Sequence, residues 1–157
     1  MTDLTFDNGN NIAGNSLIRF VPVVGIQALP TPATGGLTTA PTFQAGYRWF
    51  TCYGTEGTKN YQEQQSMDDN GSLWSITVSL FLPGDDQIRR RALADMTRHR
   101  FILEVEDNAG LMRRVGTMTE TLEFNYTFGI DAQMGGRRGY TLSFKQSFTE
   151  APPLLHY

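Results

Sequence analysis

The sequence predicts a mainly β protein, an antiparallel β-sandwich or barrel with one short α-helix and long loops. Apolar and polar residues alternate in residues 73–82 and again in 122–148, as half-buried antiparallel strands require. A single stretch after residue 85 has helical spacing instead. The length of 157 residues and the 39% apolar content fit one domain with its own core, spanning 1–157.

The first part of the chain predicts little regular structure. Residues 1–15 are polar and are expected to form a flexible arm. Residues 17–27 have strand composition, with Val24 among the expected inward residues. Pro22 lacks a backbone donor, so this strand should lie at an edge or break there. Residues 28–46 contain three prolines and predict a long extended loop.

A second long loop is predicted between two strands. Residues 47–53 return to strand composition, and 54–71 then read as a polar insertion. Structureless insertions of this length are uncommon unless they serve a partner, so 28–46 and 54–71 are both expected to be interaction loops. The best-defined core is expected in residues 72–150.

One helix and a hairpin follow the strand at 73–82. Asp85 or Asp86 can cap the helix. Its expected apolar stripe consists of Ile88, Ala92, Leu93 and Met96. Residues 101–106 and 111–115 then predict antiparallel strands joined by a tight turn. Cross-strand ion pairs are the simplest role for Arg113 and Arg114, which lie near Glu104 and Glu106 in the sequence.

The longest predicted element is a hairpin over residues 122–148, with a turn rich in Gly and Arg. Leu122, Phe124, Tyr126 and Phe128 form one apolar face, and the returning strand repeats the pattern. This hairpin should carry much of the core. Residues 151–157 are expected to leave it as an extended tail.

Charge and cysteine content exclude several classes of protein. The net charge of −3 argues against a nucleic-acid binder driven by counterion release. Cys52 is the single cysteine, so no internal disulfide can form. The N-terminus lacks the pattern of a secretory signal, and no apolar run is long enough to span a bilayer. The chain is therefore expected in a cytoplasm, without a membrane partner.

The sequence contains no recognisable catalytic or metal-binding constellation. Its two histidines are His99, at a helix-to-strand junction, and His156, next to the last residue. The run Gly135–Gly139 has neither the spacing nor the following helix of a phosphate-binding loop, so hairpin turn chemistry explains it better. We expect no enzyme, no cofactor, no metal and no small-molecule substrate.

The second half of the chain resembles a known group of proteins. The phrases that carry this are Arg-Phe-Ile-Leu-Glu-Val-Glu-Asp-Asn-Ala-Gly, Leu-Glu-Phe-Asn-Tyr, Arg-Arg-Gly-Tyr-Thr-Leu-Ser-Phe and Thr-Glu-Ala-Pro-Pro. Together, over roughly residues 72–153, they resemble small structural proteins of the tails of bacteriophages and prophages, particularly those of Bacteroidetes hosts. The layout is also similar to tail-tube and related ring-forming proteins.

This resemblance implies a virion structural protein that forms a ring with itself, expected to be a hexamer, and stacks on other tail proteins. DNA would pass through without specific binding, and assembly would occur in the host bacterial cytoplasm before the protein resides in the virion tail. Tube, terminator, adaptor and baseplate-hub roles all remain open. The expected subunit interface comprises Arg89, Arg90, Arg113, Arg114, Arg137, Arg138, Glu56, Glu63, Asp68 and Asp69.

The alternative function is a carbohydrate- or ligand-binding β-sandwich. Its stacking residues would come from Tyr47, Trp49, Tyr61 and Trp74. Alternation assigns Trp74 to the core, which weakens this alternative.

Overall fold

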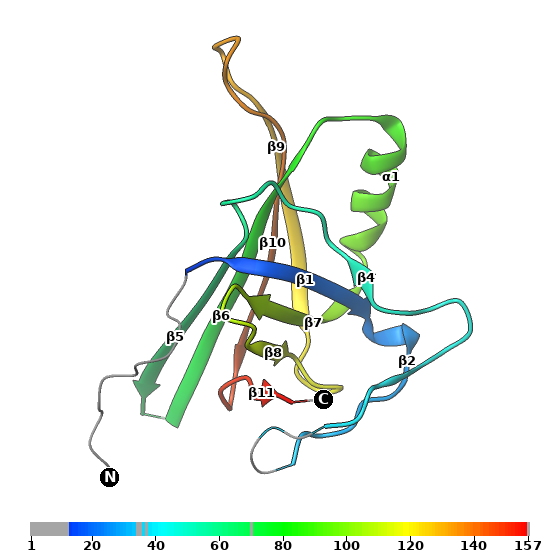
Figure 1. Cartoon of the computed structure of the whole chain (residues 1–157), viewed down its shortest axis with the longest axis vertical. Helices are drawn as coiled ribbons and strands as arrows, with labels where there is room; N and C mark the ends of the chain where they lie inside the picture. Colours follow the sequence, from blue (N-terminus) through cyan, green and yellow to red (C-terminus); the bar gives the residue numbers. More distant parts are fainter. Residues whose placement is uncertain (1–12, 34–35, 37, 70, 157) are drawn as a thin grey trace.

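The computed structural model describes residues 13–33, 36, 38–69 and 71–156. These residues are mainly β and antiparallel, with α1 as their one α-helix, which confirms the predicted fold class (Figure 1). The elements in chain order are β1 (Asn15–Pro22), the 3-10 helix η1 (Val23–Gly25), β2 (Ile26–Ala28), β3 (Thr42–Phe43), β4 (Phe50–Thr51), β5 (Asn60–Asp68), β6 (Gly71–Pro83), α1 (Gln87–Met96), β7 (Arg100–Asp107), β8 (Met112–Val115), β9 (Leu122–Ile130), β10 (Arg138–Phe148) and β11 (Leu154–Leu155).

One continuous nine-stranded sheet supplies both layers of the sandwich. Long strands in the order β5-β6-β10-β9 form the first layer, and β9 joins β7 through a short pairing. β7 then pairs with β1 on one edge and with β8 on the other, and β11 extends β8. In Figure 1 the long strands run vertically while β1, β7 and β8 cross them. No ladder joins β4 to β5 in the described residues, so a sandwich, not a closed barrel, describes this arrangement.

The core between the layers is rich in aromatic side chains. Phe144 is fully buried, and its ring lies 4.9 Å from Phe124 and 5.6 Å from Phe101, centroid to centroid. Ile18 and Cys52 join the same cluster, so the core also draws on the chain before residue 72. A smaller cluster around Ile102 covers the opposite face of β7. β7 is therefore buried on both faces.

The predicted loop at 54–71 is wrong over half its length, because Asn60–Asp68 form β5. This strand pairs with β6 without interruption, from Asn60 with Ser79 to Asp68 with Gly71. The sequence does not indicate this strand, because nearly all of its residues are exposed on both faces of the sheet. Where neither face is buried, the alternation that marks a strand is lost.

The earlier predictions for residues 13–53 are only partly confirmed. The strand does break at Pro22, where η1 begins, but Val24 is exposed and not inward. The loop at 28–46 contains the two-residue β3, which pairs with β2. Of the strand predicted at 47–53, only Phe50–Thr51 pairs. Most of the expected N-terminal arm, residues 1–12, lies outside the described residues.

The predictions for the hairpins at 101–115 and 122–148 are confirmed by β7, β8, β9 and β10. The tail prediction is wrong, because β11 returns to pair with β8 and buries Leu155. Asp86 caps α1 as expected, accepting a hydrogen bond from the Arg89 N–H at 2.8 Å. No helix of the described residues has the length and apolarity needed to cross a membrane.

The apolar stripe of α1 is shorter than predicted. Leu93 and Met96 pack on the core, whereas Ile88 is 82% exposed and Ala92 is exposed as well. The helix therefore packs on the core through its last turns, and in its first turn the Arg90 guanidinium lies 5.2 Å from the centroid of the Phe128 ring of β9.

Candidate interaction surfaces

The ten predicted interface residues do not form one surface. Arg114 is only 2% exposed and lies inside the domain, so its assignment to a subunit interface is wrong. Glu104, buried on the inner strand β7, accepts hydrogen bonds from Arg114 Nε at 3.1 Å and from Arg19 Nε at 2.7 Å. Both cations reach this carboxylate from neighbouring strands, because Glu104 pairs with Arg114 on β8 and with Arg19 on β1.

This buried cluster, Arg19–Glu104–Arg114, also holds a loop. Arg114 Nη1 donates to the Pro30 carbonyl at 2.8 Å, which fixes the start of the 28–46 loop against β8. The Arg19 guanidinium lies 5.3 Å from the centroid of the Trp49 ring. The predicted cross-strand ion pair of Arg114 is thus confirmed, with Glu104 as its partner and with a structural role.

Arg113 lies on the opposite face of β8 and is partly buried. It pairs with Asp107 at 2.8 Å, at the end of β7, so the partner in its ion pair is neither Glu104 nor Glu106, the two carboxylates that the sequence suggested. Burial opposes ionisation of Asp107, but the hydrogen bonds from Arg113 and from the Leu111 N–H lower its pKa overall. The guanidinium also covers the Tyr61 ring at 5.7 Å.

Four of the predicted arginines gather at one end of the long strands. Arg138 begins β10 next to the end of β6, and the Arg89 side chain donates to the Pro83 carbonyl at that end. Arg90 binds Asp85 with two hydrogen bonds, Nε at 2.8 Å and Nη2 at 2.7 Å. Together with Arg137, these residues form what we call the arginine end: Arg89, Arg90, Arg137 and Arg138.

Asp85 joins the helix to the hairpin at the arginine end. Besides Arg90, its carboxylate accepts a short hydrogen bond from the Tyr140 hydroxyl and lies 3.9 Å from Arg138. The hydrogen bonds from Arg90 and Tyr140 lower the pKa of Asp85 to about 2. Ionised Asp85 therefore favours the folded state.

We expect Asp85→Asn to weaken the dependence of the free energy of unfolding on pH in the acidic range. Because folding lowers the Asp85 pKa to about 2, its stabilisation is complete above about pH 4 and disappears as the pH falls towards 2. The variant should be less stable than wild type at pH 6, and the gap should close by pH 2. Urea unfolding across this range measures it. The free energy of unfolding of Tyr140→Phe should lie between those of wild type and Asp85→Asn at pH 6. A difference between wild type and Asp85→Asn that is the same at all pH values would contradict a lowered pKa for Asp85.

The predicted acidic residues divide between the two ends. Asp68 and Asp69 lie at or beside the β5–β6 turn, opposite the arginine end, and Glu63 lies along β5, where it accepts a hydrogen bond from the Tyr61 hydroxyl at 2.7 Å. Glu56 is placed at the arginine end, because its neighbour Thr55 donates to the Phe81 carbonyl near the end of β6. Glu63, Asp68 and Asp69 form what we call the acidic edge.

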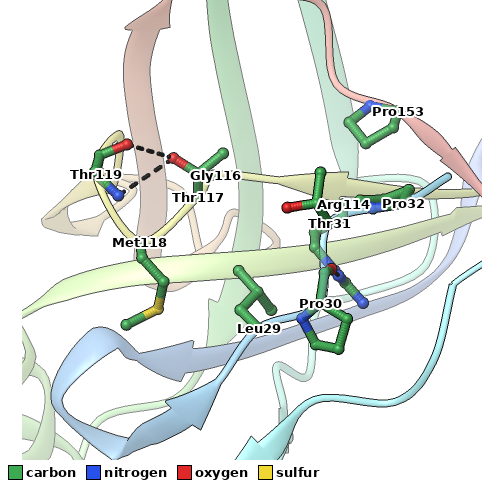
Figure 2. Close-up of a pocket in the computed structure, with 10 residues that line it drawn as sticks. All are labelled: Leu29, Pro30, Thr31, Pro32, Arg114, Gly116, Thr117, Met118, Thr119 and Pro153. Carbon is green, nitrogen blue, oxygen red and sulfur yellow. Dashed lines mark hydrogen bonds between the residues drawn. The ribbon is translucent and has the colours of Figure 1, made fainter.

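Two further features were missed by the sequence analysis. The first is an exposed apolar surface at the tip of the β9–β10 hairpin, formed by Ile130 and Met134. Apolar residues inside a Gly-rich turn are the sequence pattern that could have indicated it. A cavity of about 270 Å³, the apolar socket, lies near β11. Figure 2 shows its lining residues coming from three separate segments: Leu29, Pro30, Thr31 and Pro32 after β2; Arg114, Gly116, Thr117, Met118 and Thr119 at and after the end of β8; and Pro153 before β11.

The aromatic residues considered for sugar binding are mostly engaged elsewhere. Trp74 packs on the core, as alternation predicts, and Trp49 packs edge-on against Phe43. A polar cavity of about 630 Å³ lies instead beside the exposed Tyr53. None of the four predicted stacking residues lines that cavity, whose polar side chains include Asn15, Glu56, Lys59 and Asn108.

Within the described part of the chain, no group of three or more His, Cys, Asp or Glu residues is arranged to hold a metal ion. His99 lies near Asp95, at 3.7 Å, and His156 pairs through its backbone with Gly36. A scan against models of protein families, a search of curated proteins and a search of solved structures found no match to this chain.

Proposed function

We propose that this chain is a structural protein of a phage or phage-derived tail, which assembles with copies of itself into a ring and stacks on other tail proteins. Its role is mechanical and not catalytic, and DNA passes the ring without specific binding. The residues of the arginine end, the acidic edge and the long loops make the contacts between subunits.

The observation that carries this proposal is the open edge of β5. This strand of nine residues pairs with β6 on one side, and its other edge is left without a partner strand among the described residues. Edge strands in monomeric proteins are usually blunted by Lys, Pro, a bulge or short length. β5 has no Lys, Pro or bulge and is nine residues long, and its two charged residues are Glu63 and Asp68. An edge of this kind suits strand addition from a neighbouring subunit.

Light scattering across a concentration series, with electron microscopy of the same fractions, tests the proposal. We expect ring-sized particles that dissociate on dilution. The double variant Gln62→Lys and Gln64→Lys should then shift the mass to the monomer, because lysines on an edge strand oppose edge pairing. Both positions are exposed, and Tyr61 on the alternate face packs on the core, so the β-sheet circular dichroism should not change.

A matched control introduces the same charge on inner strands. Ser75→Lys with Thr141→Lys adds two lysines at exposed positions of β6 and β10. Ser75 is paired with both β5 and β10, and Thr141 with both β6 and β9. This control should assemble like wild type. A wild-type chain that is monomeric at every concentration, or a control that dissociates as readily as the β5 variant, would contradict the proposal.

The second candidate, a ligand-binding module, is favoured by the polar cavity beside Tyr53. An exposed aromatic ring next to Glu56, Lys59 and Asn108 offers both a stacking face and hydrogen-bonding groups. This candidate predicts a monomer that binds members of a glycan panel and loses that binding in Tyr53→Ala.

A further inference from the structure

The tip of the β9–β10 hairpin presents Met134 on a turn held by its own hydrogen bonds. The Asp131 N–H donates to the Arg137 carbonyl at 2.9 Å, and the Arg137 N–H donates to Asp131 Oδ2 at 2.6 Å. A Cβ at Gly136 would lie 2.3 Å from the Asp131 side chain, so glycine is required there. The Met134 side chain is fully exposed at the end of this turn, and the hairpin projects beyond the rest of the fold (Figure 1).

The apolar socket lies at the opposite end of the same hairpin. Its lining loop, residues 116–119, leads into β9 at Leu122, whereas the tip follows the end of β9 at Ile130. Nine residues of strand separate the two ends by roughly 30 Å. The tip therefore cannot reach the socket of its own chain, but it can reach that of another copy.

Shape and polarity match between tip and socket. Leu29, Pro30, Met118 and Pro153 give the socket a largely apolar wall, and its volume of about 270 Å³ suits a long unbranched side chain (Figure 2). Methionine adapts well to irregular apolar spaces. Ile130, 65% exposed at the end of β9, extends the apolar surface of the tip.

Charge is complementary as well. Arg137 and Arg138 follow the tip where β10 begins, with the Arg137 guanidinium 5.6 Å from the centroid of the Phe81 ring and Arg138 3.9 Å from Asp85. Acidic residues stand near the socket. The Glu120 carbonyl accepts from the N–H of Thr117 in the socket wall at 2.7 Å, and its carboxylate accepts from Thr149, next to the exposed Glu150. An arginine pair meeting two carboxylates would orient the contact.

We propose that the Met134 tip of one copy inserts into the apolar socket of a second copy, so that subunits join head to tail along the hairpin axis. Because the two surfaces differ, the contact is heterologous and repeats into a line instead of closing as a dimer. The inference rests on the proposed function and extends it: this contact stacks one ring of the chain on the next, and it is distinct from the β5 edge within a ring.

Cysteine cross-linking between two single variants tests this contact. Met134→Cys and a size-tagged Met118→Cys are mixed under mild oxidation, and a tagged-to-untagged disulfide dimer is expected. The native Cys52 gives little background because it is buried, which raises the pKa of its thiol to about 12. Val24→Cys, exposed on η1 and not part of the socket lining, replaces Met134→Cys in the control mixture and should give no tagged-to-untagged dimer.

A second variant separates this inference from the proposed function. Met134→Asp should remove stacks and leave ring-sized particles, weakening the contact about tenfold or more through loss of apolar burial. Rings that stack normally in Met134→Asp, or cross-links only between two Met134→Cys chains, overturn the head-to-tail contact alone. A wild-type chain that never assembles overturns both.

Discussion

Replacing Glu104 with Gln is expected to destabilise the fold by about 3–5 kcal/mol, the cost of removing one partner from a buried ion pair. The Glu104 side chain has no exposed surface, and Arg114 is nearly as buried. Gln keeps the size of the side chain but leaves the Arg114 guanidinium without its counter-charge. Chemical denaturation with two-state analysis, at a concentration below that of self-association, measures the loss.

The same substitution at an exposed ion pair provides the control. Glu123 pairs with Arg100 across β7 and β9, but about half of each side chain is exposed. Glu123→Gln should cost far less than Glu104→Gln, because an exposed pair is screened by solvent. If Glu104→Gln costs no more than this control, then the buried cluster does not stabilise the junction of β1, β7 and β8.

Phe144→Ala should cost about 3–5 kcal/mol, the usual range for removing a buried aromatic side chain. The Phe144 ring is fully buried and packs against Phe20, Phe101 and Phe124, which come from both layers. Its removal leaves a cavity between the two layers of the sandwich. Thermal and urea unfolding should both show the loss.

Ile88→Ala serves as the control for Phe144→Ala. Ile88 is 82% exposed on the first turn of α1, so its truncation should change the free energy of unfolding by less than about 0.5 kcal/mol. A large effect at Ile88 would mean that the first turn of the helix is covered in solution, for instance by another subunit.

Strands with one buried face were predictable because each obeys a local rule. In β6 and β10 every second side chain, from Ile76 to Leu80 and from Tyr140 to Phe144, faces the core. The hairpin turn after β7 and the Asp86 cap obey similarly local chemistry. Most of the first layer could therefore be predicted from spacing alone.

Elements that depend on distant neighbours were not predictable in the same way. β5 has no buried face to mark it and is a strand because β6 offers a complete ladder of hydrogen bonds. β11 is recognised only once β8 lies beside it. Arg114 and Arg137 each lie next to a second arginine in the sequence. Arg114 is nevertheless buried against Glu104, whereas Arg137 is exposed near the tip of the hairpin.

The sequence by itself determined a mainly β chain, its two clearest hairpins and the single helix, because backbone periodicity and turn chemistry act over a few residues. Only the tertiary structure decided which charges are interior and that Arg89, Arg90, Arg137 and Arg138 share one end of the long strands. It also decided that a fully exposed Met134 and an apolar cavity lie at opposite ends of one hairpin. Burial and proximity depend on contacts between residues far apart in the chain, and those contacts leave no local pattern in the sequence.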